Sequence, residues 1–330
     1  MRFALSPLSV SALLCSTLLL SAPSLSSAYV RTRTKVSCRT LRWAQTCIFL
    51  QPDAELVRDD MPADAAVSAM QNAVKSWNDR LDPSSFLRLY LLPVSDSREA
   101  SQIDRLGWLK FRFDRWCRPA KDPSASPVCF DSSATAVTTV SFLNKPAEAE
   151  LDGQIVDTDI DFNAVSFRFV DASQPLPKGD RRSAVDLWNV LTHELGHVQG
   201  LDHTCNLESG SASACVTDQK GNPVPTCTTL DNVRRGSQDA ETAYEAAMYP
   251  SSVSGDYSRR IPTSDDLAGV IISHPSAADP QVCTWPAVTQ GCSLAADRAS
   301  ASPVAASHLV ALLVTLCLPL LGLLRHRNDA

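Results

Sequence analysis

Residues 193–203 read HELGHVQGLDH, and the rest of the chain is interpreted around this stretch. His193 and His197 are four residues apart, so on a helix both imidazoles project from the same face, one turn apart. Glycine adopts a positive φ at little cost, so Gly200 allows a sharp turn that brings His203 back towards them. Two imidazoles on one helix face and a third after a turn are typical of a zinc site.

Three protein ligands leave the fourth position of a tetrahedral zinc ion open for water, which is typical of a catalytic rather than a structural site. Glu194 follows the first histidine, where its carboxylate can take a proton from the zinc-bound water. A structural zinc site has no use for this carboxylate. We therefore predict that His193, His197 and His203 bind zinc and that Glu194 is the catalytic base.

The flanking sequence alternates between strand and helix patterns. β-Branched runs and period-two alternation predict strands, and apolar residues spaced by three and four predict helices. The predicted strands cover residues 41–50, 86–93, 136–142 and 153–163, with 167–177 as a loop or short strand. The predicted helices cover residues 62–80, 183–200, 239–247 and 263–272. The polar, cysteine-bearing segments 94–134 and 204–240 are predicted to be insertions.

Acidic residues mark two of these elements. Along 153–163, Asp157, Asp159 and Asp161 share one face of a strand that the alternation predicts to be half-buried. They either protect an exposed strand face or bind calcium, which prefers hard oxygen ligands. The pair Asp265 and Asp266 is expected to complement the dipole of the last helix, with Thr263 or Ser264 as its cap.

Two further residues near the motif have more than one interpretation. Asp202 either orients a ligand histidine or is simply solvated. His274 is expected to be structural rather than a metal ligand.

The two ends of the chain have the patterns of targeting segments. Residues 1–28 combine Arg2, an apolar run and small residues before a cleavage site, which predicts a signal peptide for export. Residues 308–330 carry an apolar run, 309–324, followed by Arg325 and Arg327. This pattern predicts a membrane anchor with a cytoplasmic end, and it resembles bacterial C-terminal sorting tails. A core helix is the alternative. Export predicts an extracellular or cell-surface protein.

The composition narrows the function classes. The 330-residue chain contains 11 cysteines, which is high for a cytosolic protein and favours an oxidising compartment. We expect the short-range disulfides Cys38–Cys47, Cys117–Cys129 and Cys283–Cys292, with one of Cys205, Cys215 and Cys227 unpaired. The net charge of −6 and the lack of a basic run interleaved with aromatic residues argue against nucleic acid as a partner.

The motif and its flanks resemble the metzincin clan of zinc endopeptidases. THELGHVQGLDH, together with AAMYP at 246–250, is most similar to the matrixin-like branch. DGQIVDTDIDFN (152–163) resembles the strand before the active-site helix in these proteins, and IPTSDDLAGVIISHP (261–275) resembles their closing helix.

This resemblance implies an α+β fold: a twisted, mostly parallel five-stranded sheet with an antiparallel edge strand, an active-site helix and a C-terminal helix. It implies that Met248 lies beneath the metal and that Tyr249 and Pro250 form part of the substrate-pocket wall. The strand 136–142 would pair with an extended peptide substrate. The domain would span residues 38–278, between a short segment, 29–37, and a linker, 279–307.

The sequence therefore predicts a secreted or surface-anchored metalloendopeptidase. A non-catalytic adhesion module on the same fold and a zinc hydrolase of a non-peptide amide bond are the alternatives. The chain departs from matrixins in having no cysteine-switch motif before the catalytic region and a long gap between His203 and Met248. Both differences leave the activation route and the substrate preference open, and the oligomeric state is not predicted.

Overall fold

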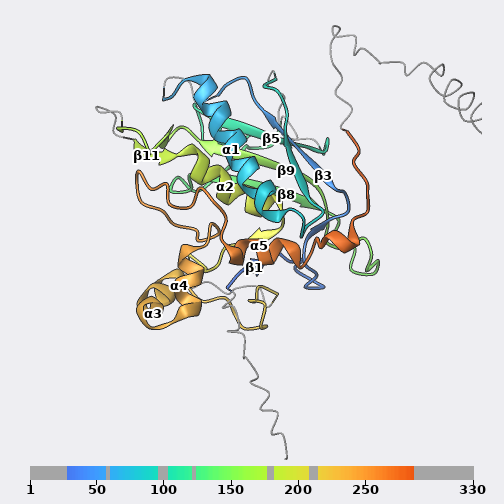
Figure 1. The fold of residues 1–330 in the computed structure, drawn as a ribbon. Helices are drawn as coiled ribbons and strands as arrows, with labels where there is room; N and C mark the ends of the chain where they lie inside the picture. The colour runs from blue at the N-terminus through green and yellow to red at the C-terminus, as the bar shows by residue number, and fades with distance from the viewer. Residues whose placement is uncertain are drawn as a thin grey trace, which may run out of the picture. The chain divides into compact units, whose positions relative to one another are not determined.

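A mixed β-sheet with helices packed against it lies at the centre of the computed structural model (Figure 1), which describes residues 28–56, 60–95, 103–120, 124–176, 182–207 and 215–285. Five strands follow one another in parallel across the sheet: β2 (Arg42–Trp43), β9 (Gln154–Asn163), β5 (Leu106–Arg112), β3 (Cys47–Pro52) and β4 (Arg88–Leu91). Strand β8 (Ala136–Phe142) pairs antiparallel with β9. This arrangement confirms the predicted fold class, and the two-residue β2 adds a sixth strand.

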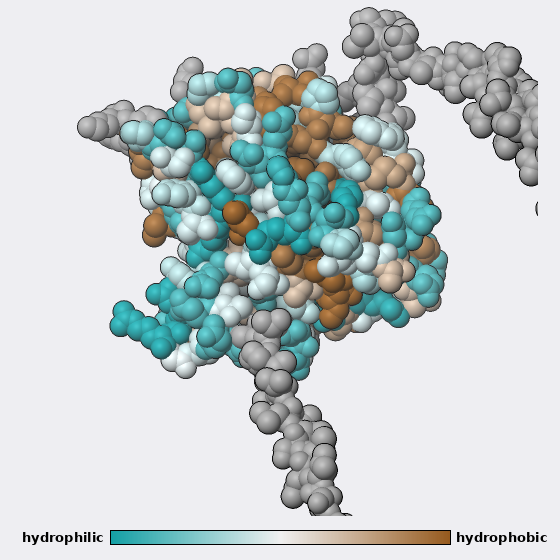
Figure 2. All heavy atoms as spheres, viewed as in Figure 1, coloured by the Kyte–Doolittle hydropathy of each residue, from teal (hydrophilic) through white to brown (hydrophobic). Residues whose placement is uncertain are grey.

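Helices α1 (Ala63–Leu81) and α2 (Leu187–Val198) pack against each other and against the sheet. The buried side of α1 carries Ala66, Met70, Ala73, Val74, Trp77 and Leu81, at the predicted spacings of three and four. Figure 2 shows hydrophilic residues gathered over the part of the surface where α1 lies in Figure 1. The Trp77 indole donates a hydrogen bond to the backbone oxygen of Thr192 at 2.9 Å, so the packing of the two helices is also fixed by a polar contact.

Strand β9 is buried on both faces, so the prediction of a half-buried strand was wrong. On one face the Phe162 ring stacks on Phe111, with the ring centroids 4.6 Å apart. On the other face the three aspartates are buried. The Arg112 guanidinium lies 2.8 Å from an Asp161 oxygen, and Arg118 also pairs with this carboxylate. Arginines therefore cover Asp161, at one end of the acidic face that the sequence left either exposed or bound to calcium.

The segment 94–134 is not an insertion, because its residues Leu106–Arg112 form β5 between β3 and β9. Charged residues interrupt the apolar pattern of this strand. Lys110 is buried, and its Nζ lies 3.3 Å from an oxygen of Asp53, a buried residue that directly follows the neighbouring strand β3. A charge can occupy a central strand when its partner is also buried beside it. Within the described part of this segment, β6 (Cys117–Arg118) and β7 (Val128–Cys129) form a small hairpin outside the sheet.

Four disulfides join the described residues, and most of them connect distant segments. Cys117–Cys129 was predicted and is confirmed. The predictions Cys38–Cys47 and Cys283–Cys292 were wrong: Cys38 pairs with Cys215, and Cys47 pairs with Cys283. The remaining bridge is Cys205–Cys227, and Cys292 lies outside the described residues. Short loops close most easily in an unfolded chain, but in the folded chain the tertiary contacts choose the pairs.

Smaller elements surround the sheet. Strand β1 (Val30–Arg31) pairs antiparallel with β12 (Leu201–Asp202), and β10 (Phe167–Val170) pairs parallel with β11 (Ser183–Asp186). The helix predicted to start at Ser183 therefore begins later, at Leu187, because the four preceding residues form a strand that pairs with β10. The C-terminal part contains α3 (Cys227–Val233), η1 (Arg234–Gly236), α4 (Gln238–Glu245), α5 (Ser264–Ile271) and η2 (Ser276–Ala278).

The predicted targeting segments lie outside the described residues, apart from Ala28. Among the residues that the structure describes, no helix has the length and apolarity needed to cross a membrane.

The buried acids of β9 predict a pH-dependent stability. Burial, with the Asp159 and Asp104 carboxylates nearby, raises the pKa of Asp157 to about 8. Because this folded-state pKa lies above that of the unfolded chain, the stability that Asp157 contributes is present at low pH and is lost as the pH rises towards 8. Asp157→Asn should therefore match the wild type near about pH 4 and exceed its free energy of unfolding by roughly 1 kcal/mol or more near pH 8.

Urea unfolding at the two pH values measures this difference. Asp79→Asn, which changes an exposed carboxylate, is the control and should shift neither value. An Asp157→Asn effect that is the same at both pH values would contradict the assignment.

Candidate metal centre and catalytic site

Helix α2 carries the first part of the site and is held at both ends. Asp186 is its N-cap: one carboxylate oxygen accepts a hydrogen bond from the Asn189 backbone at 2.8 Å and another from Arg260 at 2.9 Å. At the other end, the Trp43 indole donates to the backbone oxygen of Val198 at 2.8 Å. These contacts fix the position of the helix and therefore the direction of its side chains.

The three predicted histidines come together. The Nε2 atoms of His193 and His203 are 3.1 Å apart, and those of His197 and His203 are also 3.1 Å apart. Among the described residues, this is the only group of three or more histidines, cysteines or acids whose ligand atoms all lie close enough to hold a metal ion. Zinc–nitrogen bonds of about 2.0–2.1 Å in a tetrahedral arrangement place neighbouring nitrogens at about this separation.

In two of the histidines, the ring nitrogen that faces away from this point has a carbonyl partner. His193 Nδ1 lies 2.6 Å from the Ala247 oxygen, and His197 Nδ1 lies 2.9 Å from the Leu201 oxygen. A carbonyl can only accept, so each Nδ1 carries the proton and each Nε2 keeps its lone pair for a metal. Burial lowers the pKa of His193 to about 3 and holds the pKa of His203 well below its usual value. Neutral imidazoles that converge in this way fit a zinc ion.

The turn that returns His203 depends on Gly200, whose φ is +85°. A Cβ at this position would also lie 3.0 Å from the Leu41 oxygen and from the Arg31 guanidinium. Arg31 is buried and donates hydrogen bonds to the backbone oxygens of Gly200, Leu41 and Gly269. No signal in the sequence marks Arg31, because it lies in a basic and polar run, YVRTRTK at 29–35.

Met248 packs against helix α2, and its predicted place beneath a metal ion stays a prediction. Met248 is buried, and a Cβ added to Gly196 would lie 2.1 Å from its sulfur, so the close approach requires glycine at this place in the helix. The buried Asp266 carboxylate accepts hydrogen bonds from the backbones of Ala247 and Met248, at 2.9 and 3.2 Å. Thr263 and Asp266 also form the capping box of α5, so Thr263 is the cap, as predicted, and its partner Asp266 additionally holds this turn.

Glu194 is buried beside the histidines, and burial raises its pKa. One carboxylate oxygen, Oε2, accepts a hydrogen bond from the Thr138 hydroxyl of β8 at 2.6 Å. The Thr138 backbone also hydrogen-bonds this carboxylate, which lowers the pKa that burial raises. The sequence analysis placed Thr138 on the edge strand but gave it no function.

Tyr249 and Pro250 follow Met248, and their predicted place in a substrate-pocket wall stays a prediction. The Tyr249 ring packs into a separate apolar cluster with Cys205, Cys227, Leu230, Ala240 and Ala243. Its phenol donates a hydrogen bond to Asp231 of α3 at 2.9 Å. Burial and Asp231 raise the pKa of Tyr249 to about 12, so this phenol stays protonated.

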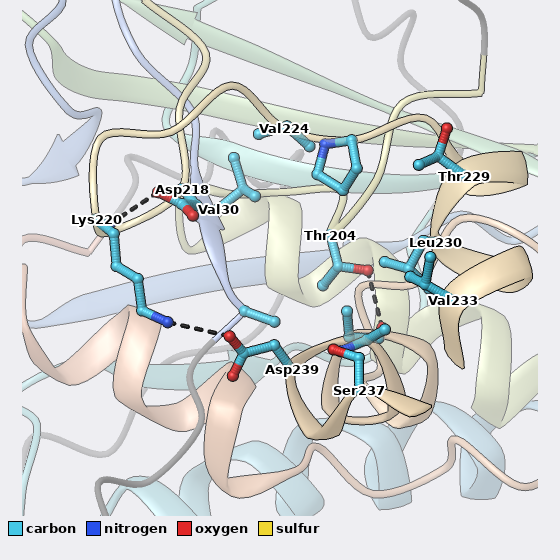
Figure 3. A pocket seen from close by; sticks show the side chains of 14 residues that line it. Val30, Thr204, Asp218, Lys220, Val224, Thr229, Leu230, Val233, Ser237 and Asp239 are labelled. Carbon is cyan, nitrogen blue, oxygen red and sulfur yellow. Dashed lines mark hydrogen bonds and ion pairs between the residues drawn. The ribbon is translucent and has the colours of Figure 1, made fainter. Parts of the chain in front are cut away.

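The segment 204–240 forms a cavity of about 200 Å³ beside the site (Figure 3). Thr204, which follows His203, points into it from one side and donates a hydrogen bond to the Ala243 oxygen. The side chains of Val224 and Leu230 contribute to its apolar lining, and the Lys220–Asp239 ion pair, 3.1 Å long, closes its edge.

The other polar residues near the motif have structural partners. The Asp202 carboxylate accepts a hydrogen bond from the His203 backbone rather than from a histidine ring. His274 is buried away from the triad: Trp43 N donates to its Nε2, and its Nδ1 lies 3.2 Å from the Val270 oxygen. The expectation of a structural histidine is therefore confirmed. Asp265 accepts a hydrogen bond from the Ala28 backbone nitrogen.

Residues 129–260 match the model of the family Reprolysin_5, metallo-peptidase family M12. This range contains β8, β9, helix α2 and the three histidines. No curated protein shows significant similarity to the chain. The family match and the histidine cluster support a zinc metalloprotease domain of the metzincin type. The match does not support the matrixin-like branch that the sequence suggested.

The contact between Met248 and helix α2 predicts an unusual cost for a small substitution. Gly196→Ala should lower the free energy of unfolding by about 1–3 kcal/mol through overpacking, although alanine normally favours a helix over glycine. Gly236→Ala is the matched control, because a Cβ there meets no atom within 4 Å. Chemical unfolding measures both changes, and a Gly196→Ala protein as stable as the wild type would contradict the contact.

The three convergent imidazoles predict stabilisation by zinc. Zinc at about 100 times its Kd should stabilise the wild type by about 2.7 kcal/mol, measured as a rise in Tm. Magnesium should produce no rise through this site, because it prefers oxygen ligands to imidazole. His203→Ala should lose most of the zinc effect. An equal zinc-dependent rise in the His203→Ala protein would show that the metal binds elsewhere.

Proposed function

We propose that this protein is an exported zinc-dependent metalloendopeptidase. The observation that carries the proposal is the convergence of three Nε2 atoms beside a buried carboxylate, with His193, His197 and His203 as metal ligands and Glu194 as catalytic base. The segments 1–28 and 308–324, as signal peptide and anchor, would place it outside the cell or at the cell surface.

When bound, the zinc ion supplies a Lewis acid that makes water acidic and polarises the scissile carbonyl. Glu194 takes the proton of the attacking water and then passes it to the leaving amine. The low dielectric around this buried carboxylate strengthens its interaction with the proton that it transfers. Met248 keeps the underside of the site dry and closely packed, as its burial against Gly196 suggests.

Strand β8 would bind the substrate. Among the described residues it pairs only with β9, so its other side offers backbone groups to an extended peptide. Such pairing supplies affinity through the main chain and leaves specificity to side-chain pockets. The wall formed by Tyr249 and Pro250 would contribute such a pocket, and α3 and α4 would set its far side through the Tyr249–Asp231 hydrogen bond.

Glu194→Ala tests the mechanism. This variant should retain zinc, because its three ligands are intact, and should lose roughly 10²–10⁴-fold in kcat for peptide cleavage. The measurements are zinc content and the hydrolysis of an unstructured protein such as casein, with a chelator abolishing the wild-type rate. Glu148→Ala, which removes an exposed carboxylate, is the control. A wild type that binds zinc and cleaves no peptide would favour an adhesion module or a non-peptide hydrolase.

A further inference from the structure

The Thr138 hydroxyl has a specific position relative to Glu194. Its Oγ1 lies 2.6 Å from Oε2 of the carboxylate and 3.4 Å from the backbone oxygen of the same residue. A threonine hydroxyl has a single proton to donate. Only the shorter contact, to Oε2, has the usual length of a hydrogen bond, so the proton goes to the carboxylate. The carboxylate is therefore bound through Oε2 to the Thr138 hydroxyl of β8, and the backbone of the same residue also hydrogen-bonds it.

The strand register determines where this hydroxyl points. Thr138 lies opposite Ile160 of β9, and β8 also contacts helix α2. Side chains alternate between the faces of a strand, so Val137 and Thr139 point to the opposite face from Thr138. A β-branched residue has few χ1 rotamers, so the backbone of β8 fixes the hydroxyl closely.

We propose that Thr138 is a positioning residue for the catalytic base: it holds one oxygen of Glu194 so that the other faces the attacking water. The inference rests on the proposed function, and it adds a residue outside the HExxH motif to the reaction. The terminal torsion of a glutamate is broad, so a carboxylate without an anchor samples many orientations. A hydrogen bond to an ionised oxygen is short and strong enough to restrict it.

The same strand would connect substrate binding to the base. An extended peptide would pair with the side of β8 that faces away from β9. This pairing restricts the backbone that carries Thr138, and the Thr138 hydroxyl in turn restricts the Glu194 carboxylate. A misplacement of about 1 Å in a reacting group can cost about 10²-fold in rate. The effect of losing the hydroxyl should therefore fall on kcat rather than on KM.

The test compares Thr138→Val and Thr138→Ser with the wild type in the zinc-loaded, full-length protein. Valine keeps the shape and removes the hydroxyl, so kcat for a peptide substrate should fall about 10- to 100-fold. KM should stay within about twofold, and zinc content should not change. Serine restores the hydroxyl and should recover most of kcat. The control is Thr158→Val on β9. It removes a buried hydroxyl that has no hydrogen-bond partner among the described residues, and it should leave kcat unchanged.

Crystal structures of the zinc-loaded wild type and Thr138→Val protein give a second readout that is independent of activity. The Glu194 carboxylate should be ordered with Oε2 towards Thr138 in the wild type and rotated or disordered in the variant. Wild-type kcat in Thr138→Val, or the same loss in Thr138→Ser, would overturn the inference while the proposed function stands. A wild type without zinc-dependent cleavage would overturn both, and this outcome is visible before any Thr138 variant is measured.

Discussion

The site depends on helix α2 being held rigidly against the sheet. Its N-cap carboxylate binds Arg260, and its backbone oxygens accept hydrogen bonds from the indoles of Trp77 and Trp43. A helix that is fixed in this way presents two imidazoles and one carboxylate at constant spacing. Only the turn at Gly200 is then needed to bring the third imidazole within reach. Each later step of the proposed chemistry uses this geometry.

One residue, Ala247, connects the C-terminal helix to the candidate metal centre through its two backbone groups. The Ala247 N–H donates to the buried Asp266, while the Ala247 oxygen faces Nδ1 of His193. Asp266 therefore acts on the histidine through the backbone, and its place in the α5 capping box fixes the carboxylate. Buried acids that accept several backbone hydrogen bonds are a recurring way to hold irregular turns without regular secondary structure.

The sequence predicts well those elements that have a strongly periodic pattern or that are fixed by residues close by in the chain. The amphipathic helix α1, the strand β8 and the α5 cap are within a residue or two of their predicted places. Strand β5 was missed because Lys110 and Arg112 look like surface residues. Their charges are compatible with burial only because each has an acidic partner far away in the sequence: Asp53 for Lys110, and Asp161 of β9 for Arg112. Two of the three disulfide predictions failed for a related reason, since sequence separation does not measure distance in the fold.

The motif alone predicted the three histidines that converge in the fold and the glutamate beside them, because helical periodicity and glycine's access to positive φ are properties of the local chain. The local chain could not show that Thr138 hydrogen-bonds Glu194, that Arg31 hydrogen-bonds the Gly200 turn, or that two arginines pair with Asp161 of β9. These contacts join residues that are far apart along the chain. Burial determines their strength, and burial arises only when the sheet, the two helices and the C-terminal segment pack together.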